Sequence, residues 1–244
     1  MKSLRVVTYN VHGCVGTDGK RSEARIARVL AAMQPDIVGL QELDLGRQRS
    51  RGVDQAGLIA ESLGYERRFH PAMQREDEHY GDAILSRWPM EIQRAGSLPS
   101  GKKSFLCPEI RGALWVKLMT PAGQVHVINT HLGLGRAERR EQATALAGSE
   151  WVGAVPLDEP LLLLGDLNSF PKSAACQILR QNLSNSSDGQ TGRWATFPTF
   201  CPLLTLDYIF CNASVQVKSL RVFRSTEARR ASDHFPLVAE IMLT

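Results

Sequence analysis

The stretch LLLLGDLNS (161–169) runs from four consecutive leucines directly into an acid, an amide and a hydroxyl side chain. A short apolar run bounded by polar residues is typical of a strand that is buried on both faces, so we predict a strand over 160–166. Such a strand delivers Asp166 and Asn168 to the edge of a sheet, where loops on a rigid scaffold assemble sites. The same ending recurs elsewhere in the chain.

Six predicted strands place an acid, an amide or an imidazole at or near one of their ends. These residues are Asn10 after VVTY, Glu42 after IVGLQ, His131 after VINT, Asp166 and Asn168, Asp207 in LLTLDYIF, and the pair Asp233 and His234 before the last strand. Each residue alone fits a turn, a helix cap or a polar group satisfied by its neighbours. Six strands with one chemical pattern favour a single site to which all of them contribute.

The order of strands and helices predicts an α/β fold with two packed sheets covered by helices, because several strands are joined by hairpins. Strands are expected at 4–10, 36–42, 80–86, 112–119, 124–130, 160–166, 206–211, 215–223 and 235–243. Helices are expected from Ser22 to Pro35, from Asp54 to Gly64, over 136–152 and over 172–181, with a mobile loop over 182–193.

The composition is that of a globular chain that can bury a core, with 43% hydrophobic and 22% charged residues in 244. We predict one domain over 1–244 and a monomer. No apolar run approaches the ~20 residues of a membrane span, and MKSLRVVTYN lacks the apolar stretch of a signal peptide. Five scattered cysteines without a CxxC pair argue against a disulfide framework or a zinc site and predict a reducing, cytoplasmic location.

Four of the residues at the strand ends are carboxylates, so their charges need compensation if they meet. They are Glu42, Asp166, Asp207 and Asp233. Two unit charges ~4 Å apart repel by roughly 4 kcal/mol at an effective dielectric of ~20, so the group requires a cation, a protonated histidine or both. Carboxylate and amide oxygens suit Mg²⁺ or Mn²⁺, whereas zinc is usually offered more His and Cys.

The same residue types favour phosphoryl chemistry, because Mg²⁺ typically shares its coordination shell with substrate phosphate. A GxSxG elbow is absent from the sequence, which argues against acyl transfer by serine. A GxxxxGK[ST] loop is also absent, which argues against a P-loop nucleotide hydrolase.

Eight motifs together carry a family resemblance: TYNVHG, LQE, GDAILSR, RGAL, NTHLG, GDLNS, LDYIF and SDHFPL. In this order and spacing they resemble the endonuclease/exonuclease/phosphatase family, which includes DNase I, exonuclease III-type repair nucleases, neutral sphingomyelinases and inositol polyphosphate 5-phosphatases. The resemblance extends from residue 4 to residue 240. It implies a four-layer α/β sandwich, with two mixed sheets flanked by helices, and a metal-dependent phosphoesterase.

The resemblance also implies how the metal and the water are held. Asn10 and Glu42 would hold the Mg²⁺ (or Mn²⁺), with Glu42 as the main ligand and Asp233 joining the cluster. Asp166 and Asn168 of GDLN would position the attacking water and the scissile phosphate. The implied mechanism is in-line attack of water on phosphorus, in which either Asp166 or His234 is the base.

Two histidines follow from the same resemblance. Asp207 would hydrogen-bond His234, which fixes its tautomer and favours its charged form, and His131 matches a second histidine of the DNase I and sphingomyelinase branches. Three further motif residues would contact the substrate phosphate: Asp82, Arg111 and Asn129.

One of these residues departs from the family pattern. Asp82 stands where the GNAILSR motif usually has an asparagine, and an ionised carboxylate cannot donate a hydrogen bond to phosphate. We expect Asp82 either to lie near the phosphate or to pair with a local group such as Arg87 or His79.

The leading hypothesis is a Mg²⁺-dependent phosphodiesterase or nuclease. Nucleic acid is one candidate partner, because the net charge is +4 and Arg47, Arg49 and Arg51 could contact backbone phosphates. A second hypothesis is a lipid-headgroup or inositol phosphate hydrolase, which the aromatic content of 7% and the lack of a membrane-inserting stretch disfavour. A third is a non-catalytic binding module, against which the intact set of acids and histidines argues.

Overall fold

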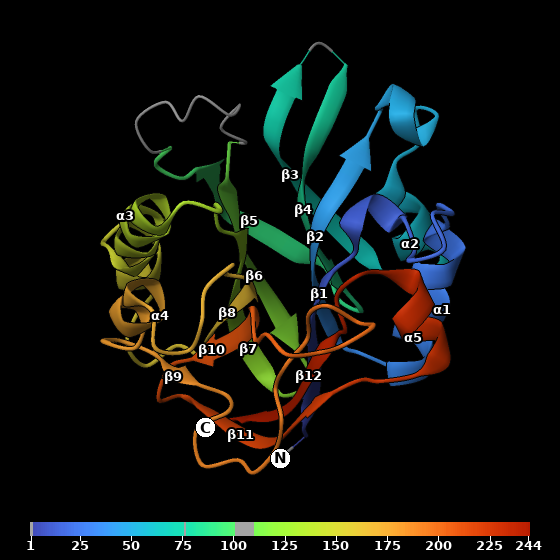
Figure 1. The fold of residues 1–244 in the computed structure, drawn as a ribbon. Coiled ribbons are helices and arrows are strands. Elements are labelled where there is room, and N and C mark those ends of the chain that lie inside the picture. Colours follow the sequence, from blue (N-terminus) through green and yellow to red (C-terminus); the bar gives the residue numbers. More distant parts are fainter. Residues whose placement is uncertain (1, 76, 101–109) are drawn as a thin grey trace.

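A computed structural model describes residues 2–75, 77–100 and 110–244 of the chain. Within these ranges the chain forms two six-stranded sheets stacked face to face, with helices on both outer faces (Figure 1). The first sheet has the order β11 (Val215–Val222), β12 (Leu237–Leu243), β1 (Leu4–Asn10), β2 (Ile37–Leu45), β4 (Glu78–Ser86), β3 (Glu66–Arg75). The second has the order β5 (Met90–Ser97), β6 (Gly112–Thr120), β7 (Gly123–His131), β8 (Leu161–Asp166), β10 (Asp207–Cys211), β9 (Ser184–Asn185).

Helices complete the four layers. The first sheet is covered by α1 (Glu23–Met33), α2 (Gln55–Leu63) and α5 (Thr226–Ala231), and the second by α3 (Arg136–Ala147) and α4 (Ala174–Leu179). Three short 3₁₀ turns are η1 (His12–Cys14), η2 (Gln48–Ser50) and η3 (Val152–Ala154). The predicted four-layer α/β sandwich is confirmed.

Three apolar clusters hold the layers together. One lies between the sheets and contains Val6, Leu114 and Leu164. The other two lie under the helices, where Leu30 of α1 packs with the first sheet and Leu146 of α3 packs with the second. A strand such as β8, whose leucines alternate between two of these clusters, is buried on both faces, as its apolar run predicts.

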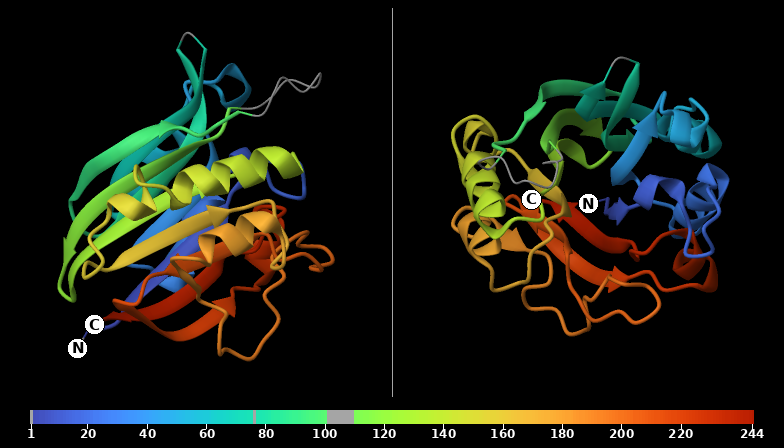
Figure 2. Two further views of the ribbon diagram at one scale, coloured as in Figure 1. Left: turned by 90° about the vertical axis from the view of Figure 1, so that its left-hand side faces the viewer. Right: turned by 45° about the horizontal axis from the view of Figure 1, so that its top comes forward.

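The topology brings the polar strand ends to one end of the sandwich. The central strands β1 and β2 are parallel, and so are β7 and β8. The antiparallel strand β10 begins at Asp207, opposite Asp166, and β12 begins at Leu237, opposite Thr8. In the left view of Figure 2 the orange and red loops gather at the end of the sandwich opposite the two chain termini.

A polar bridge joins the two sheets just below this end. Asn129 of β7 is fully buried, and its amide donates to the backbone carbonyls of Leu40 and Ala83, both at 2.9 Å. Its carbonyl oxygen accepts from the Gln41 amide at 2.7 Å. Because all of these partners belong to the first sheet, Asn129 fixes the position of β7 relative to β2 and β4.

The predicted elements agree with the observed ones except at the edges. Strands β3 and β5 were not expected, because ERRFHPAMQR and MEIQRAGS lie at the edges of their sheets and lack a regular apolar alternation. The short helix α5 was also not expected. The helix predicted over 136–152 ends at Ala147, where Gly148 leaves the helical conformation. The stretch 182–193 contains β9 and a turn braced by Arg180 and Asp188, and its mobility stays a prediction.

No helix in the described ranges is long and apolar enough to cross a membrane. The cytoplasmic location and the monomeric state stay predictions.

Candidate active site

The amide of Asn10 joins two carboxylates at the ends of the central strands. Its Nδ2 donates to Glu42 Oε1 at 2.9 Å and to Asp166 Oδ2 at 3.0 Å. Its Oδ1 accepts from the backbone N–H of His12 at 3.0 Å, which fixes the orientation of the amide. Asn10 therefore brings one carboxylate from each sheet to the same point.

A β-bulge turns Glu42 toward this point. The pairing of β2 with β4 shifts between Leu40 and Leu43, and both of these leucines lie in the core beneath α1 and α2. In a regular strand, two side chains that face the same way are separated by one residue. Here Leu40 and Leu43 are separated by two, Gln41 and Glu42. Glu42 has a φ of 64°, a left-handed conformation that costs free energy and is found most often at functional sites.

Glycine allows Asp166 to approach β7 closely. A Cβ atom at Gly165 would lie 2.0 Å from the carbonyl oxygen of Thr130, so no larger residue fits there. After Asp166 the chain turns sharply, with Asn168 at a φ of 47° and its N–H donating to Asp166 Oδ1 at 2.8 Å. The GDLN motif thus consists of a close strand contact followed by a tight turn.

His234 is held against a buried acid. Its Nδ1 lies 2.8 Å from Asp207 Oδ2, and the ring of Phe197 packs on the imidazole with centroids 4.8 Å apart. Burial disfavours the charged imidazole, but the neighbouring charge and hydrogen bond of Asp207, followed by the charges of Asp166 and Asp233, outweigh it and raise the pKa of His234 to about 10. His234 is therefore a cation at neutral pH, with Nε2 as its free donor.

His131 is held against a buried cation. Arg111 Nη1 lies 2.8 Å from Nδ1 of His131, and burial, the Arg111 charge and the His234 charge hold the pKa of His131 well below its usual value. A guanidinium can only donate, so Nδ1 accepts from Arg111, while Nε2 faces a second donor, the amide nitrogen of Asn168. Nε2 lies 2.9 Å from Asn168 Nδ2 and 3.9 Å from Glu42 Oε1.

One oxygen, Asp166 Oδ2, lies between the two histidines. It is 3.6 Å from Nε2 of His131 and 3.7 Å from Nε2 of His234. Burial and the charge of Asp207 raise the pKa of Asp166 to about 7, although His234 and two hydrogen bonds oppose the shift. A carboxylate with this pKa can gain and lose a proton near neutral pH, which is the property that a general base requires.

Asp233 lies to one side of this group. Its Oδ1 is 3.8 Å from Nδ1 of His12 and 3.3 Å from the hydroxyl of Ser232, and its side chain is partly exposed. The compact acidic and imidazole group of the described residues consists of Asp166, Asp207 and His234. The participation of Asp233 in a metal cluster stays a prediction.

Two predicted substrate contacts lie in different surroundings from those expected. Asn129 is buried between the sheets with its amide engaged as described above, so we correct its assignment from a phosphate contact to a link between the sheets. Arg111 is also buried, behind His131, so it acts on the site through that histidine. Sequence alone does not reveal which side of a strand faces the interior at these positions.

Two of the three arginines in the stretch 47–51 interact with one buried acid. The fully buried Asp44 accepts from Arg49 Nη2 at 2.7 Å and lies 3.6 Å from Arg47 Nη1. Both guanidiniums also lie over the ring of Tyr80. Arg51 is exposed on the adjoining turn. Two of the three arginines proposed for nucleic acid thus have a structural role that the charge pattern did not predict.

Asp82 is buried on β4, opposite His70 of β3 and beside the bulge that holds Glu42. Arg87, one of the two local partners considered for Asp82, lies 3.1 Å from Asp36 instead. The contact of Asp82 with the substrate phosphate stays a prediction.

Three residues of the site were not expected from the sequence. Phe197 packs on His234, and His12 faces Asp233. The buried hydroxyl of Ser232 donates to the Asn10 carbonyl at 2.8 Å and accepts from the His234 N–H at 3.2 Å, which ties β1 to the approach to β12. Ser232 belongs to the SDH motif and could have been inferred from it, whereas Phe197 has no local signal.

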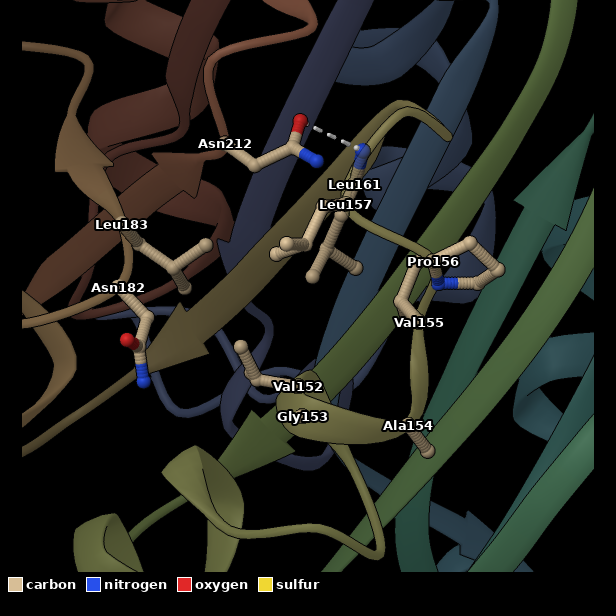
Figure 3. A pocket seen from close by; sticks show the side chains of 10 residues that line it. All are labelled: Val152, Gly153, Ala154, Val155, Pro156, Leu157, Leu161, Asn182, Leu183 and Asn212. Atoms are coloured by element: carbon tan, nitrogen blue, oxygen red, sulfur yellow. Dashed lines mark hydrogen bonds between the residues drawn. The ribbon is translucent and has the colours of Figure 1, made fainter.

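A separate cavity of about 510 Å³ lies at the other end of β8. It is lined by apolar side chains around η3 and the start of β8 (Figure 3). Its polar group Asn212 is engaged, because the Oδ1 accepts from the Leu161 N–H at 3.1 Å and the Nδ2 donates to the carbonyl of Glu159. The cavity is therefore remote from the acids and histidines described above.

Comparison with known proteins agrees with this geometry. The family model described as "Endonuclease/Exonuclease/phosphatase family" matches residues 7–234. The chain belongs to this family. It is 30% identical to the uncharacterized protein YbhP of Escherichia coli (strain K12) over 258 residues, covering 99% of this chain and 97% of that protein.

Solved structures of the same fold match the whole chain. An endonuclease/exonuclease/phosphatase from Beutenbergia cavernae superposes with a TM-score of 0.80 at 24% identity, covering 100% of this chain and 72% of that chain. The mannosyl-6-phosphatase Bt3783 of Bacteroides thetaiotaomicron superposes with a TM-score of 0.76 at 22% identity, covering 98% and 100%. The prediction of an enzyme that hydrolyses phosphoester bonds is confirmed at the level of the family.

Proposed function

We propose that this protein is a Mg²⁺- or Mn²⁺-dependent phosphodiesterase that hydrolyses a P–O bond by in-line attack of water. The observation that supports the proposal is the position of Asp166 Oδ2. This acid has a pKa of about 7 and lies within 4 Å of two histidines, one cationic and one neutral. This arrangement places a proton acceptor, a cation and a neutral imidazole at one point, which suits the transfer of a phosphoryl group to water.

The donor set fits a hard divalent cation. Glu42 and Asp166 offer carboxylate oxygens held together by one Asn10 amide, and Oδ1 of Asp207 is buried without a hydrogen-bond partner among the described residues. His234 has no lone pair to offer while it is protonated. We therefore assign the cation to Glu42 and the side-chain carbonyl oxygen of Asn10, which leaves Asp166 to act as the base. When bound there, it would polarise the phosphoryl oxygens of the substrate and neutralise developing charge.

The residues of the chain divide the remaining work. Asp166 accepts the proton of the attacking water. The His234 imidazolium, oriented by Asp207, donates from Nε2 to a phosphoryl oxygen, and the neutral His131 lies on the other side of Asp166. Asn168 holds the turn that places these groups together, Asp233 is a partly exposed acid beside them, and Asp82 is buried next to the bulge of Glu42. With His234 as the fixed cation, we choose Asp166 as the base.

The substrate class is a diester, because the site pairs one cationic donor with one base and offers few further cationic groups for the doubly charged phosphate of a monoester. The phosphatase named among the solved structures keeps a monoesterase as the second candidate. Support for nucleic acid as the substrate is reduced, because Arg47 and Arg49 are engaged by Asp44. We further propose a cytoplasmic monomer that folds as one domain.

Hydrolysis of bis-p-nitrophenyl phosphate tests the proposal directly. Chelation with EDTA should abolish the reaction, and Mg²⁺ or Mn²⁺ should restore it, because the clustered carboxylates otherwise repel the anionic substrate. The Glu42→Gln variant should require a higher Mg²⁺ concentration for half-maximal rate and should also lower kcat. The exposed Glu150→Gln is the matched control, since Glu150 pairs with Arg94 at the surface. Full activity in EDTA would sink the metal-dependent mechanism.

A further inference from the structure

Nine large apolar side chains of the described residues are exposed, and four of them lie on loops beside the candidate active site. These four, which we call the apolar rim, are Leu134 (75% exposed), Phe170 (58%), Phe200 (76%) and Leu203 (75%). They are far apart in sequence, which is why the chain has no continuous apolar stretch there.

Each rim residue is tied to a residue of the site. Leu134 follows His131 by three residues, and Phe170 follows Asn168 by two. Phe200 and Leu203 lie on the loop 197–204, whose first residue packs on the ring of His234. The three loops belong to the end of the sandwich where the orange loops gather in Figure 2.

The loop 197–204 holds its apolar side chains in solvent by specific bonds. Its ends are closed by a pair of backbone hydrogen bonds between Phe197 and Leu204, at 3.1 and 2.9 Å. In its middle, Thr199 is fully buried, with its N–H donating to the Asp233 carbonyl at 2.9 Å and its hydroxyl to the Ser232 carbonyl at 3.1 Å. Phe200 is therefore exposed by a braced loop rather than by a frayed one.

Basic side chains accompany the rim. Arg136 and Arg140 share one face at the start of α3, directly after the loop of Leu134, and Lys172 follows Phe170. Arg230 lies on α5, two residues before the SDH motif. All four are exposed, and none of their side chains forms an ion pair within 2–75, 77–100 and 110–244. Their charges are thus available to an anionic partner.

We propose that the apolar rim and these four basic residues dock the protein on an anionic phospholipid bilayer. Apolar side chains at separate loop tips can enter a lipid interface one by one, and basic side chains between them meet headgroup phosphates. A peptide or helix partner would instead require a continuous apolar groove. The docked orientation points the candidate active site at the headgroups, and only that consequence rests on the proposed function.

Vesicle co-sedimentation tests the docking without any measurement of hydrolysis. The wild-type protein should bind vesicles of phosphatidylcholine mixed with phosphatidylglycerol, should bind pure phosphatidylcholine vesicles at least several-fold less, and should be released by salt. The triple variant Phe170→Ser/Phe200→Ser/Leu203→Ser should lose on the order of tenfold or more in partition coefficient, because each side chain leaves the lipid interface. The matched control is Met119→Ser/Leu157→Ser, which removes two exposed apolar side chains away from the site.

The outcomes separate the two proposals. A rim variant with an unchanged unfolding temperature and lost vesicle binding supports the docking surface. Equal binding by the rim and control variants, equal binding to neutral and anionic vesicles, or no binding of the wild type would each overturn it. A wild-type dimer in sedimentation velocity that the rim variant dissociates would also overturn it, in favour of a protein interface. Hydrolysis of a soluble diester, measured separately on the wild type, decides the proposed function alone.

Discussion

The two histidines beside Asp166 are the same residue type at almost the same distance from one oxygen, yet they differ in charge. His234 faces the acid Asp207, and its pKa is raised to about 10. His131 faces the base Arg111, and its pKa is lowered well below the usual value. Burial acts on both in the same direction, so the partner on the far nitrogen decides the outcome. The two halves of the site thus contain a cationic and a neutral imidazole from one side-chain type.

The comparison predicts unequal losses of activity. His234→Ala should lower kcat on the order of 10²–10⁴-fold, the usual contribution of a positioned acid or base, whereas His131→Ala removes only a neutral imidazole and should cost roughly 10-fold. Steady-state rates on bis-p-nitrophenyl phosphate at saturating Mg²⁺ measure both. Equal losses in the two variants would show that the charge difference has no role in the reaction.

The support given by Asp207 can be removed separately. Asp207→Asn should cost a large part of the His234→Ala loss, roughly 10–10³-fold in kcat, and the double variant should be far less than multiplicative, because the pair acts as a unit. The charged His234 is required, so the wild-type rate should fall as pH rises through about 10, and in Asp207→Asn this fall should begin at a lower pH. Asp188→Asn, which removes a surface partner of Arg180, is the control. Independent effects of the two substitutions would refute the pairing.

Substitution of Arg111 should change the activity less than substitution of Asp207. Arg111→Gln removes a neighbouring cation, so the pKa of His131 should rise, although only in part because burial is the larger influence. The imidazole resonances of His131, followed by NMR from pH 5 to 8, measure the shift, and kcat should change by less than about 10-fold. Arg87→Gln should leave the His131 titration unchanged, since Arg87 pairs with Asp36. An unchanged titration in Arg111→Gln itself would assign the whole shift to burial.

The free energy of unfolding should show the smallest effects, with opposite signs for the two histidines. The raised pKa of His234 gives stability that is complete below its unfolded value and is lost as pH rises toward about 10, so in EDTA the wild type should lose about 2–2.5 kcal/mol more than His234→Gln between pH 7 and 9. The lowered pKa of His131 costs stability as pH falls below 6.5, and His131→Gln should remove that loss. Urea titrations across this pH range measure both slopes. Parallel pH profiles for the wild type and the two variants would contradict the opposite charge states.

Sequence predicted the members of the site better than their surroundings. Asp166 could be located because a buried strand ends in it, and Glu42 because it follows the apolar run of β2, although β2 continues beyond it to Leu45. The Asp207–His234 pair followed from the family resemblance. The Arg111–His131 contact could not be inferred, since it depends on which residue of RGAL faces inward. Asn129 was misassigned for the same reason, because its motif does not reveal that the amide lies between the sheets.

The fold was predictable where strands are buried on both faces and not where they form an edge. The apolar run of β8 predicts a strand. In β3 and β5 the apolar and polar residues alternate irregularly, because these edge strands pack on one face only. The arginines of RQRSRG illustrate the same limit for charge. Their partner Asp44 is in the preceding strand β2, and only the folded chain brings the carboxylate under the guanidiniums.

The bridge made by Asn129 has a consequence for how this scaffold can diversify. It lies two residues before His131 in one sheet and contacts the residues beside the bulge of Glu42 in the other, so it fixes the distance between the strands that carry His131 and Glu42. Variants that keep this amide should tolerate exchanged surface loops without a change in the spacing of those two residues. A designer who seeks a new specificity should therefore graft loops and leave this amide untouched.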